Sequence, residues 1–204
     1  VVCAIVPRLA IDRELFEPIR ELKNFDDYTF THALNVCVLS SALARALRVP
    51  DEMVNTIAMA GPCHDLGKKE VPKEILNYNG PLEPGDRLMV ERHPFFGAQT
   101  LLEIPSVESS YPLLPVVAYQ HHMGANQSGY PRVQSRIPQY TLHFASLLVA
   151  IVDVYDALRT VRPYRPALTV AKAATILIRD ALAGKLHKEY VSSFLLLLNV
   201  LAAG

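Results

Sequence analysis

Apolar residues recur every three or four positions along most of the chain, the spacing typical of amphipathic helices. No run of strictly alternating apolar and polar residues predicts a strand. The segment 67–85 is rich in proline and glycine and predicts a loop with one helical turn near Lys73–Leu76, and 124–138 is polar and turn-rich. We expect helices over 12–22, 26–47 (with Asp26 or Asp27 as N-cap), 51–64, 84–102, 113–122, 139–160, 168–182 and 187–201.

The pattern continues without an evident domain boundary. Half of the 204 residues are apolar, which is enough to bury one substantial core, and neither a Ser/Gly-rich linker nor an internal repeat divides the chain. We therefore expect an all-α fold, a single helical bundle over 1–204, with 1–25 as an N-terminal helical extension and 26–204 as the core. The first residue is Val rather than Met, so we expect a piece of a longer protein.

Charge and cysteine usage limit the partners. Twenty basic residues balance twenty acidic ones, so no global field attracts a nucleic-acid backbone or an anionic membrane, and any phosphate recognition must be local. Cys3, Cys37 and Cys63 form no CxxC pair and predict reduced thiols.

The apolar run at 194–198 is too short to span a bilayer and no signal peptide is visible, so we expect a cytoplasmic protein. The helix carrying that run serves as core or as a dimer face, and we favour core.

Three contexts suggest chemistry. His64-Asp65 ends an apolar helix, where a buried imidazole and carboxylate need a compensating charge such as a divalent cation. His121-His122 precedes a tight turn, where two consecutive side chains can reach one ion. Asp153 stands in the middle of an apolar helix and needs a cationic partner, a donor cluster or a metal.

Each context has an ordinary alternative. A lone histidine is more often a hydrogen-bonded core or surface group, a paired histidine can be a surface feature, and Asp156 can be a solvated acid or a support for a ligand. His143 and His187 lack any suggestive context and are interpreted as ordinary residues.

The motifs taken together resemble the HD-GYP branch of the HD metal-dependent phosphohydrolase superfamily. The resemblance covers 26 to the C-terminus, and the order of the motifs is more specific than any one of them. They are Tyr28-Thr29-Phe30-Thr31-His32, His64-Asp65-Leu66-Gly67-Lys68, His93-Pro94 with Gly97, His121-His122, Gly129-Tyr130-Pro131, Asp153-Val154-Tyr155-Asp156-Ala157-Leu158 and Arg162-Pro163-Tyr164-Arg165.

The resemblance implies an HD-type helical bundle with extra C-terminal helices that acts as one catalytic domain. It implies one metal on His32, His64, Asp65 and Asp153, and a second on Asp65, His93, His121 and His122. Asp65 would bridge the two ions together with a water or hydroxide. Iron or manganese is expected, since imidazole and carboxylate ligands suit such ions.

The implied activity is hydrolysis of cyclic di-GMP to pGpG, GMP or both by a bridging hydroxide, with Asp65 and Lys68 as catalytic residues. Lys68, Tyr130, Arg162 and Arg165 match the substrate-contacting positions. Implied partners are the cyclic dinucleotide, an upstream regulatory domain, diguanylate-cyclase-type proteins and a second copy of the chain; long nucleic acid is not expected.

This chain departs from the family at two places. Tyr28 stands where some members carry a glutamate that binds a third metal, so we expect two metals. Met123, Asn126 and Gln127 replace a glutamate, an aspartate and a glycine after the paired histidines. These changes leave two alternatives open: a nucleotide-binding sensor or adaptor without useful turnover, and a phosphohydrolase for another nucleotide.

Overall fold

The computed structural model describes residues 13–25, 27–132, 141–161 and 166–202. Within these ranges the chain is helical and forms no β-strand, as the apolar spacing predicts. The helices are α2 (Arg13–Phe25), α3 (Asp27–Ala46), α4 (Asp51–Cys63), the 3-10 helix η1 (Leu66–Glu70), α5 (Lys73–Leu76), α6 (Pro84–Glu91), α7 (His93–Leu102), α8 (Pro105–Ser110), α9 (Leu113–Gln120), α10 (Phe144–Arg159), α11 (Val170–Leu182) and α12 (Lys188–Ala202).

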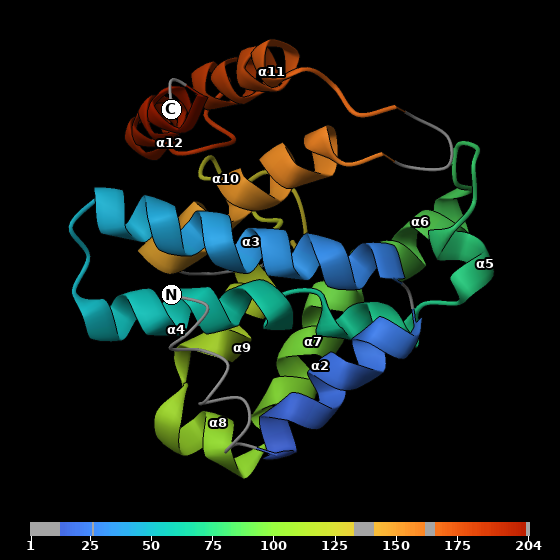
Figure 1. Cartoon of the computed structure of the whole chain (residues 1–204). Helices are drawn as coiled ribbons and strands as arrows, with labels where there is room; N and C mark the ends of the chain where they lie inside the picture. Colours follow the sequence, from blue (N-terminus) through green and yellow to red (C-terminus); the bar gives the residue numbers. More distant parts are fainter. Residues whose placement is uncertain (1–12, 26, 133–140, 162–165, 203–204) are drawn as a thin grey trace.

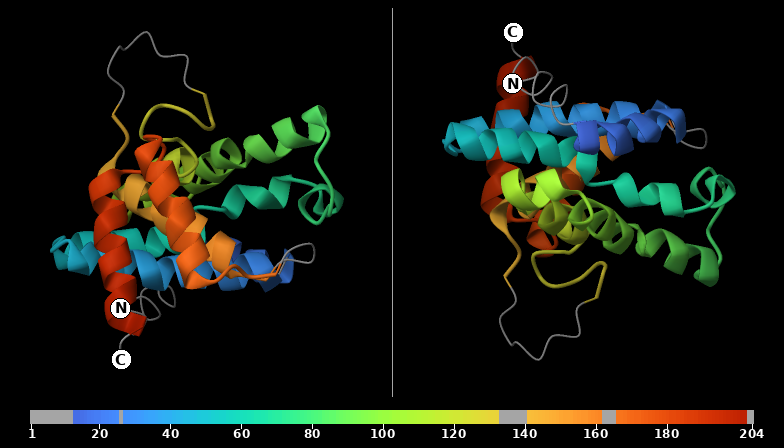
Figure 2. Two further views of the ribbon diagram at one scale, coloured as in Figure 1. Left: turned by 90° about the horizontal axis from the view of Figure 1, so that it is seen from above. Right: turned by 90° about the horizontal axis from the view of Figure 1, so that it is seen from below.

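The bundle is built around α3, α4 and α10. Helices α3 and α4 lie side by side along most of their lengths, and α10 packs against the opposite flank of α3 (Figure 1). Helices α11 and α12 cover α10, while α7 and α9 pack together on the other side of α4 (Figures 1 and 2). The sequence-predicted all-α bundle is therefore confirmed.

Helix α10 is central because nearly all of its faces are apolar. Leu148, Ile151 and Val152 are completely buried, and Tyr155 packs edge-on against Phe194 of α12 at a ring distance of 5.1 Å. Burying each large aliphatic side chain stabilises the fold by about 1.5–3 kcal/mol. Phe194 is also completely buried and Leu198 nearly so, and the apolar run of the last helix therefore packs on the core, as favoured from the sequence, while Leu196 of the same run is 67% exposed.

Three differences from the predicted helices are larger than a shift of three residues at one end. The predicted helix over 84–102 is two helices, because Pro94 has no N–H to donate to the carbonyl of Val90 and the ladder breaks at Arg92. The helix predicted from 139 starts at Phe144, where the His143 side chain accepts a hydrogen bond from the N–H of Ala145. Segment 67–85 is not all loop before its short helix, because η1 runs through Leu66–Glu70.

One prediction cannot be checked, and one helix was not predicted. Asp26, one of the two predicted N-caps, lies outside the described residues, and α3 begins at Asp27. Helix α8 had no counterpart among the predictions, and with six residues it is too short for periodicity to show.

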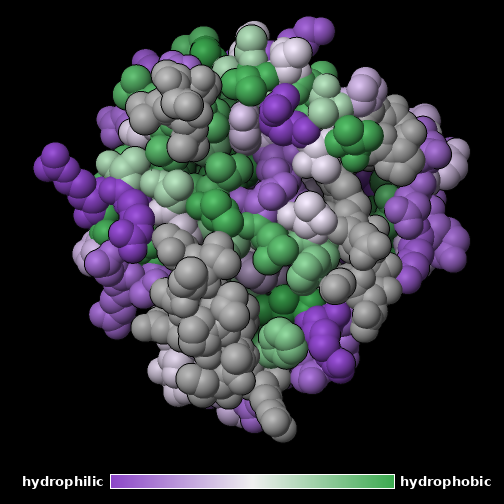
Figure 3. All heavy atoms as spheres, in the orientation of Figure 1, coloured by the Kyte–Doolittle hydropathy of each residue, from purple (hydrophilic) through white to green (hydrophobic). Residues whose placement is uncertain are grey.

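The surface mixes polar and apolar groups. On the face shown in Figure 3, apolar and polar residues are interspersed, and hydrophilic residues gather toward the left and right edges. None of the described helices combines the length and apolar character needed to cross a bilayer.

Candidate metal centre

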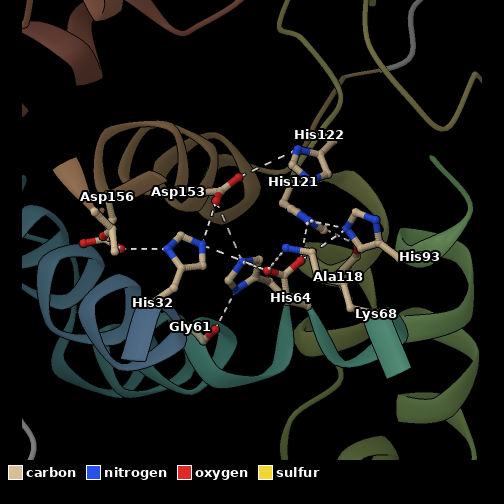
Figure 4. A network of polar contacts seen from close by, with 12 residues as sticks. His32, Gly61, His64, Lys68, His93, Ala118, His121, His122, Asp153 and Asp156 are labelled. Carbon is tan, nitrogen blue, oxygen red and sulfur yellow. Dashed lines mark hydrogen bonds and ion pairs between the residues drawn. The ribbon is translucent and has the colours of Figure 1, made fainter. Parts of the chain in front are cut away.

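Five helical elements bring seven histidine and aspartate side chains together. His32 comes from α3, His64 and Asp65 from the end of α4, His93 from the start of α7, His121 and His122 from the end of α9, and Asp153 from α10. All except His122 are buried, with His122 partly so. All seven residues predicted as metal ligands are thus brought into one cluster, which Figure 4 shows from close by.

The cluster divides into two groups of ligand atoms. Atoms of Asp65, His93, His121 and His122 lie within 4.8 Å of one another, and so do atoms of His32, His64 and Asp153. Such groups of imidazole nitrogens and carboxylate oxygens match the donors that transition-metal ions accept.

Asp65 lies between the two groups. Its Oδ2 is 3.2 Å from Nε2 of His64 and 4.0 Å from Nε2 of His32. Its Oδ1 is 3.3 Å from Nε2 of His93 and 3.8 Å from Nε2 of His121. One carboxylate oxygen therefore faces each group, the arrangement expected of a residue that bridges two cations.

Three of the histidines are oriented by the helix ends at which they lie. The last carbonyls of a helix lack intrahelical partners. Nδ1 of His64 lies 2.6 Å from the carbonyl of Gly61, Nδ1 of His93 lies 2.7 Å from that of Val90, and Nδ1 of His121 lies 2.8 Å from that of Ala118. Because a carbonyl only accepts, each Nδ1 carries a proton, and each ring turns its Nε2 toward the cluster.

The same carbonyl connects the break at Pro94 to the site. Pro94 leaves the Val90 carbonyl without its usual donor, and the His93 ring supplies one. The dipeptide His93-Pro94 therefore ends one helix, starts the next and orients a ligand atom.

His32 is oriented by a carboxylate instead. Its Nδ1 lies 2.7 Å from Oδ2 of Asp156, and its Nε2 lies 3.0 Å from Oδ1 of Asp153. Asp156 is buried and bonded to His32, so it is not a solvated acid, and its position fits the other role left open from the sequence, support for a ligand. The sequence signal was its position three residues after Asp153, which puts both carboxylates on one face of α10.

The electrostatics keep Asp65 ionised and divide the imidazoles, with His121 and His122 neutral and His32 protonated at pH 7. Burial opposes ionisation of Asp65, but the charges of His64 and Lys68 outweigh it and hold its pKa well below the usual range. Burial lowers the pKa of His122 to about 3 and that of His121 well below its usual value, so both rings stay neutral at pH 7. Burial also opposes protonation of His32, yet hydrogen bonds to Asp153 and Asp156 raise its pKa to about 9.

Several of these nitrogen and oxygen atoms lack a positively charged or hydrogen-bonding partner, which a cation would supply. Nε2 of His64 and Oδ1 of Asp65 are buried among the described residues without a hydrogen-bond partner. Nε2 of His93 and Nε2 of His121 face each other at 3.2 Å, although both Nδ1 atoms hold the protons. Two lone pairs at that distance repel unless a proton or a cation lies between them. The buried His/Asp cluster therefore fits metal ions.

Lys68 reaches the cluster from η1. Its ammonium donates to Oδ2 of Asp65 at 2.6 Å, and its side chain remains 20% exposed. Gly67 makes this approach possible, because a Cβ there would lie 2.0 Å from the carbonyl oxygen of His93. The tight contact between η1 and α7 thus holds Lys68, Asp65 and His93 together.

Tyr130 lies beside the second group. Its ring centroid is 4.7 Å from that of His122 and 6.1 Å from that of His93. The other two predicted substrate-binding residues, Arg162 and Arg165, lie outside the described residues, as does the side chain of Tyr28.

The turn after the paired histidines explains two of the sequence departures. Met123 is buried and forms an isolated β-bridge with Gly129. Gln127 has a φ of 65°, in the left-handed region that glycine adopts without strain. A glycine here, as in the family pattern, would adopt this φ without strain, whereas this chain places a glutamine in the turn.

Comparison with known proteins identifies the family of the chain. The model of the HD domain family matches residues 16–187. The chain is 38% identical over 152 residues to cyclic di-GMP phosphodiesterase PA4108 of Pseudomonas aeruginosa, covering 74% of this chain and 35% of that protein. It is 30% identical over 189 residues to a cyclic di-GMP phosphodiesterase of Thermotoga maritima (89% and 49%), and 30% identical over 164 residues to 3'3'-cGAMP-specific phosphodiesterase 1 of Vibrio cholerae (79% and 36%).

Solved structures share the fold. The PgpH HD domain of L. monocytogenes, in complex with cyclic-di-AMP, superposes with a TM-score of 0.63 at 19% identity, over 91% of this chain and 96% of that one. Bd1817, an HDG"Y"P protein from Bdellovibrio bacteriovorus, gives a TM-score of 0.64 at 21% identity, over 85% of this chain and 52% of that one.

The chain spans about a third to a half of the length of the three curated phosphodiesterases named above. The chain belongs to the HD domain family, in the HD-GYP branch that its ordered motifs and its curated relatives indicate.

Proposed function

We propose that the chain is a metal-dependent phosphodiesterase domain that hydrolyses a cyclic dinucleotide, cyclic di-GMP in the first place, to pGpG, GMP or both. One observation carries the proposal. The two oxygens of Asp65 face two separate groups of ligand atoms, and within them His64 Nε2 and Asp65 Oδ1 are buried without a hydrogen-bond partner among the described residues.

The geometry favours two divalent cations. His32, His64 and Asp153 with Oδ2 of Asp65 would hold one, and His93, His121 and His122 with Oδ1 of Asp65 the other. Iron or manganese suits this mixture of imidazole and carboxylate donors. When bound, two such cations supply a water of lowered pKa and positive charge beside the scissile phosphodiester.

The chain's own residues position the reaction. The carbonyls of Gly61, Val90 and Ala118 fix three imidazole rings, so the ligand atoms need little reorganisation. The phosphate oxygens gain negative charge during hydrolysis, and the ammonium of Lys68, next to Asp65, lies where it stabilises that charge.

The substrate-binding roles proposed from the family likeness fall on Lys68, Tyr130, Arg162 and Arg165. Tyr130 lies against the histidines of the second group, which supports its role. Names of the curated relatives support a cyclic dinucleotide as the class of substrate, since they include both cyclic di-GMP and 3'3'-cGAMP phosphodiesterases.

A sensor domain without useful turnover is the second candidate, and His122 is the observation that favours it. His122 is partly exposed, and its Nδ1 is 3.7 Å from Oδ2 of Asp153, beyond hydrogen-bond distance. Met123 follows it and offers no carboxylate. A weakly held ligand at this position would reduce catalysis before it reduced metal binding at the other group.

The test is hydrolysis of cyclic di-GMP, followed by chromatography, with protein purified anaerobically and loaded with Mn²⁺ or Fe²⁺. We expect pGpG or GMP to form, to stop after chelation, and to be lost in His93→Ala while the control His187→Ala retains it. Tight nucleotide binding with no product would favour the sensor. Product formation that survives chelation and His93→Ala would overturn the metal-dependent mechanism.

A further inference from the structure

A pocket of about 380 Å³, open to solvent on one side, lies next to the metal centre. Its walls come from the loop before α6, from α6 itself and from the turn after the paired histidines: Pro81, Leu82, Arg87, Val90, Glu91 and Tyr130. The volume falls in the range of sites that hold small molecules. We call it the base cavity.

Two of its walls also belong to the metal centre. The Val90 carbonyl accepts the Nδ1–H of His93, and the Tyr130 ring lies 4.7 Å from the ring of His122. A nucleotide whose phosphate contacts the cations therefore has its neighbouring groups within reach of this cavity.

The base cavity combines apolar walls with one donor and one acceptor of opposite charge. Pro81, Leu82 and Val90 offer apolar surface, and Tyr130 offers a ring on which a base can stack. Arg87 and Glu91 lie one helical turn apart, and Nε of Arg87 donates to Oε1 of Glu91 at 2.8 Å. This bond leaves both Nη groups of the guanidinium, Oε2 of the carboxylate and the second lone pair of Oε1 available to a ligand.

The exposure of the pair differs between its members. The side chain of Arg87 is 72% exposed, whereas that of Glu91 is 27% exposed. An exposed ion pair on a helix contributes only a few tenths of a kcal/mol, so stability alone gives little reason for it. Its location in the wall of a cavity beside the metal centre allows the ion pair to contact a bound ligand.

We propose that the base cavity binds a guanine base of the substrate and that Glu91 and Arg87 select guanine over adenine; this rests on the function proposed above. Glu91 accepts from the N1–H and 2-amino group, and Arg87 donates to O6. These groups adjoin on the guanine edge, as the carboxylate and guanidinium adjoin on α6. Adenine has no 2-amino group and presents an acceptor at N1, which the carboxylate repels.

The test is calorimetric binding of cyclic di-GMP and cyclic di-AMP to the Mn²⁺-loaded chain. We compare wild type with Glu91→Gln, and with Asp86→Asn as a control that removes one negative charge from the same helix outside the cavity wall. One bidentate base contact is worth about 1–3 kcal/mol, so Glu91→Gln should weaken cyclic di-GMP binding about 10- to 100-fold. Binding of cyclic di-AMP should change little, and Asp86→Asn should bind both ligands as wild type does.

Cleavage of bis(p-nitrophenyl) phosphate, a phosphodiester without a base, separates this inference from the proposed function. The metal content of the Glu91→Gln variant should equal that of wild type, and the control Asp86→Asn should cleave the compound at the wild-type rate. If wild type cleaves neither this compound nor cyclic di-GMP, the proposed function fails, while the binding comparison still decides the role of Glu91. Wild-type binding of cyclic di-GMP by Glu91→Gln, or an equal loss for both dinucleotides, would overturn the inference.

Discussion

His32 on α3 and Asp156 on α10 are joined by a buried hydrogen bond of 2.7 Å between Nδ1 and Oδ2. The bond connects residues 124 positions apart and directs Nε2 of His32 toward Asp153 and Asp65. Asp156 therefore does for His32 what backbone carbonyls do for the three histidines at helix ends. A carboxylate in this position also makes the imidazole a stronger ligand.

Replacing Asp156 with alanine should weaken metal binding in the group that contains His32. Loss of such a supporting carboxylate typically costs about 10- to 100-fold in metal affinity or activity. The affinity for Mn²⁺ is measured by titration in competition with a chelator. Asp51→Ala, which removes an exposed carboxylate, serves as the control. An Asp156→Ala variant that keeps wild-type affinity would show that His32 is oriented by other groups.

Gly67 should not tolerate a methyl group. A Cβ at Gly67 would lie 2.0 Å from the His93 carbonyl oxygen and 2.4 Å from the backbone nitrogen of Gly97, and backbone atoms cannot move aside cheaply. We expect Gly67→Ala to destabilise the fold by more than about 3 kcal/mol in urea unfolding.

Gly85 provides the matched comparison for Gly67. A Cβ at Gly85, in helix α6, meets nothing within 4 Å. Gly85→Ala should therefore stabilise the chain by about 0.5–1 kcal/mol through helix propensity. Similar effects of the two substitutions on the free energy of unfolding would refute the close approach of η1 to α7.

Replacing Gln127 with glycine should stabilise the fold. Its φ of 65° costs a residue with a side chain about 1 kcal/mol relative to glycine, partly offset by the greater freedom of glycine in the unfolded chain. We expect Gln127→Gly to raise the free energy of unfolding by about 0.5 kcal/mol.

The neighbouring Asn126 supplies the contrast to Gln127. Its side-chain amide donates to the Ala183 carbonyl at 3.0 Å and its side-chain oxygen accepts from the Ser128 N–H at 3.1 Å. Asn126→Gly should thus cost about 1 kcal/mol in the same unfolding measurement. A destabilising Gln127→Gly would show that the glutamine side chain makes contacts that offset its backbone conformation.

Cys37 should react slowly with thiol reagents. Burial raises the pKa of its thiol to about 11, so about one thiol in a thousand is ionised at pH 8, and the thiolate is the reactive form. Cys63 is also a buried thiol that forms no disulfide among the described residues. Labelling with a chromogenic disulfide at pH 8, followed by mass spectrometry, should modify both cysteines only in urea. Rapid modification of Cys37 in the native chain would contradict its burial.

The fold was predictable wherever a long segment carries apolar residues at helical spacing. The pattern that predicted a helix ending at Leu47 matches α3, which ends at Ala46, since buried Val36, Leu43 and Ala44 follow helical spacing. Periodicity did not separate α6 from α7, because the break depends on one absent N–H at Pro94. It also missed η1, whose path is set by tertiary contact between Gly67 and α7.

The candidate site was predictable as a set of residues but not as a geometry. The order of the motifs singled out all seven clustered side chains. It did not reveal that backbone carbonyls orient His64, His93 and His121, because any sequence supplies those carbonyls. Glu91 escaped notice because a single acidic residue in a helix ordinarily faces water.

The central claim is that Asp65 joins two metal positions, and elemental analysis with a Mn²⁺ titration of Asp65→Ala tests it most directly. We predict about two equivalents per chain for wild type, and for Asp65→Ala a loss of affinity at both positions together with cyclic di-GMP hydrolysis. Asp86→Asn, which removes a carboxylate outside the cluster, should behave as wild type. Full occupancy and turnover in Asp65→Ala, or a wild-type chain that binds no metal after anaerobic loading, would contradict the account.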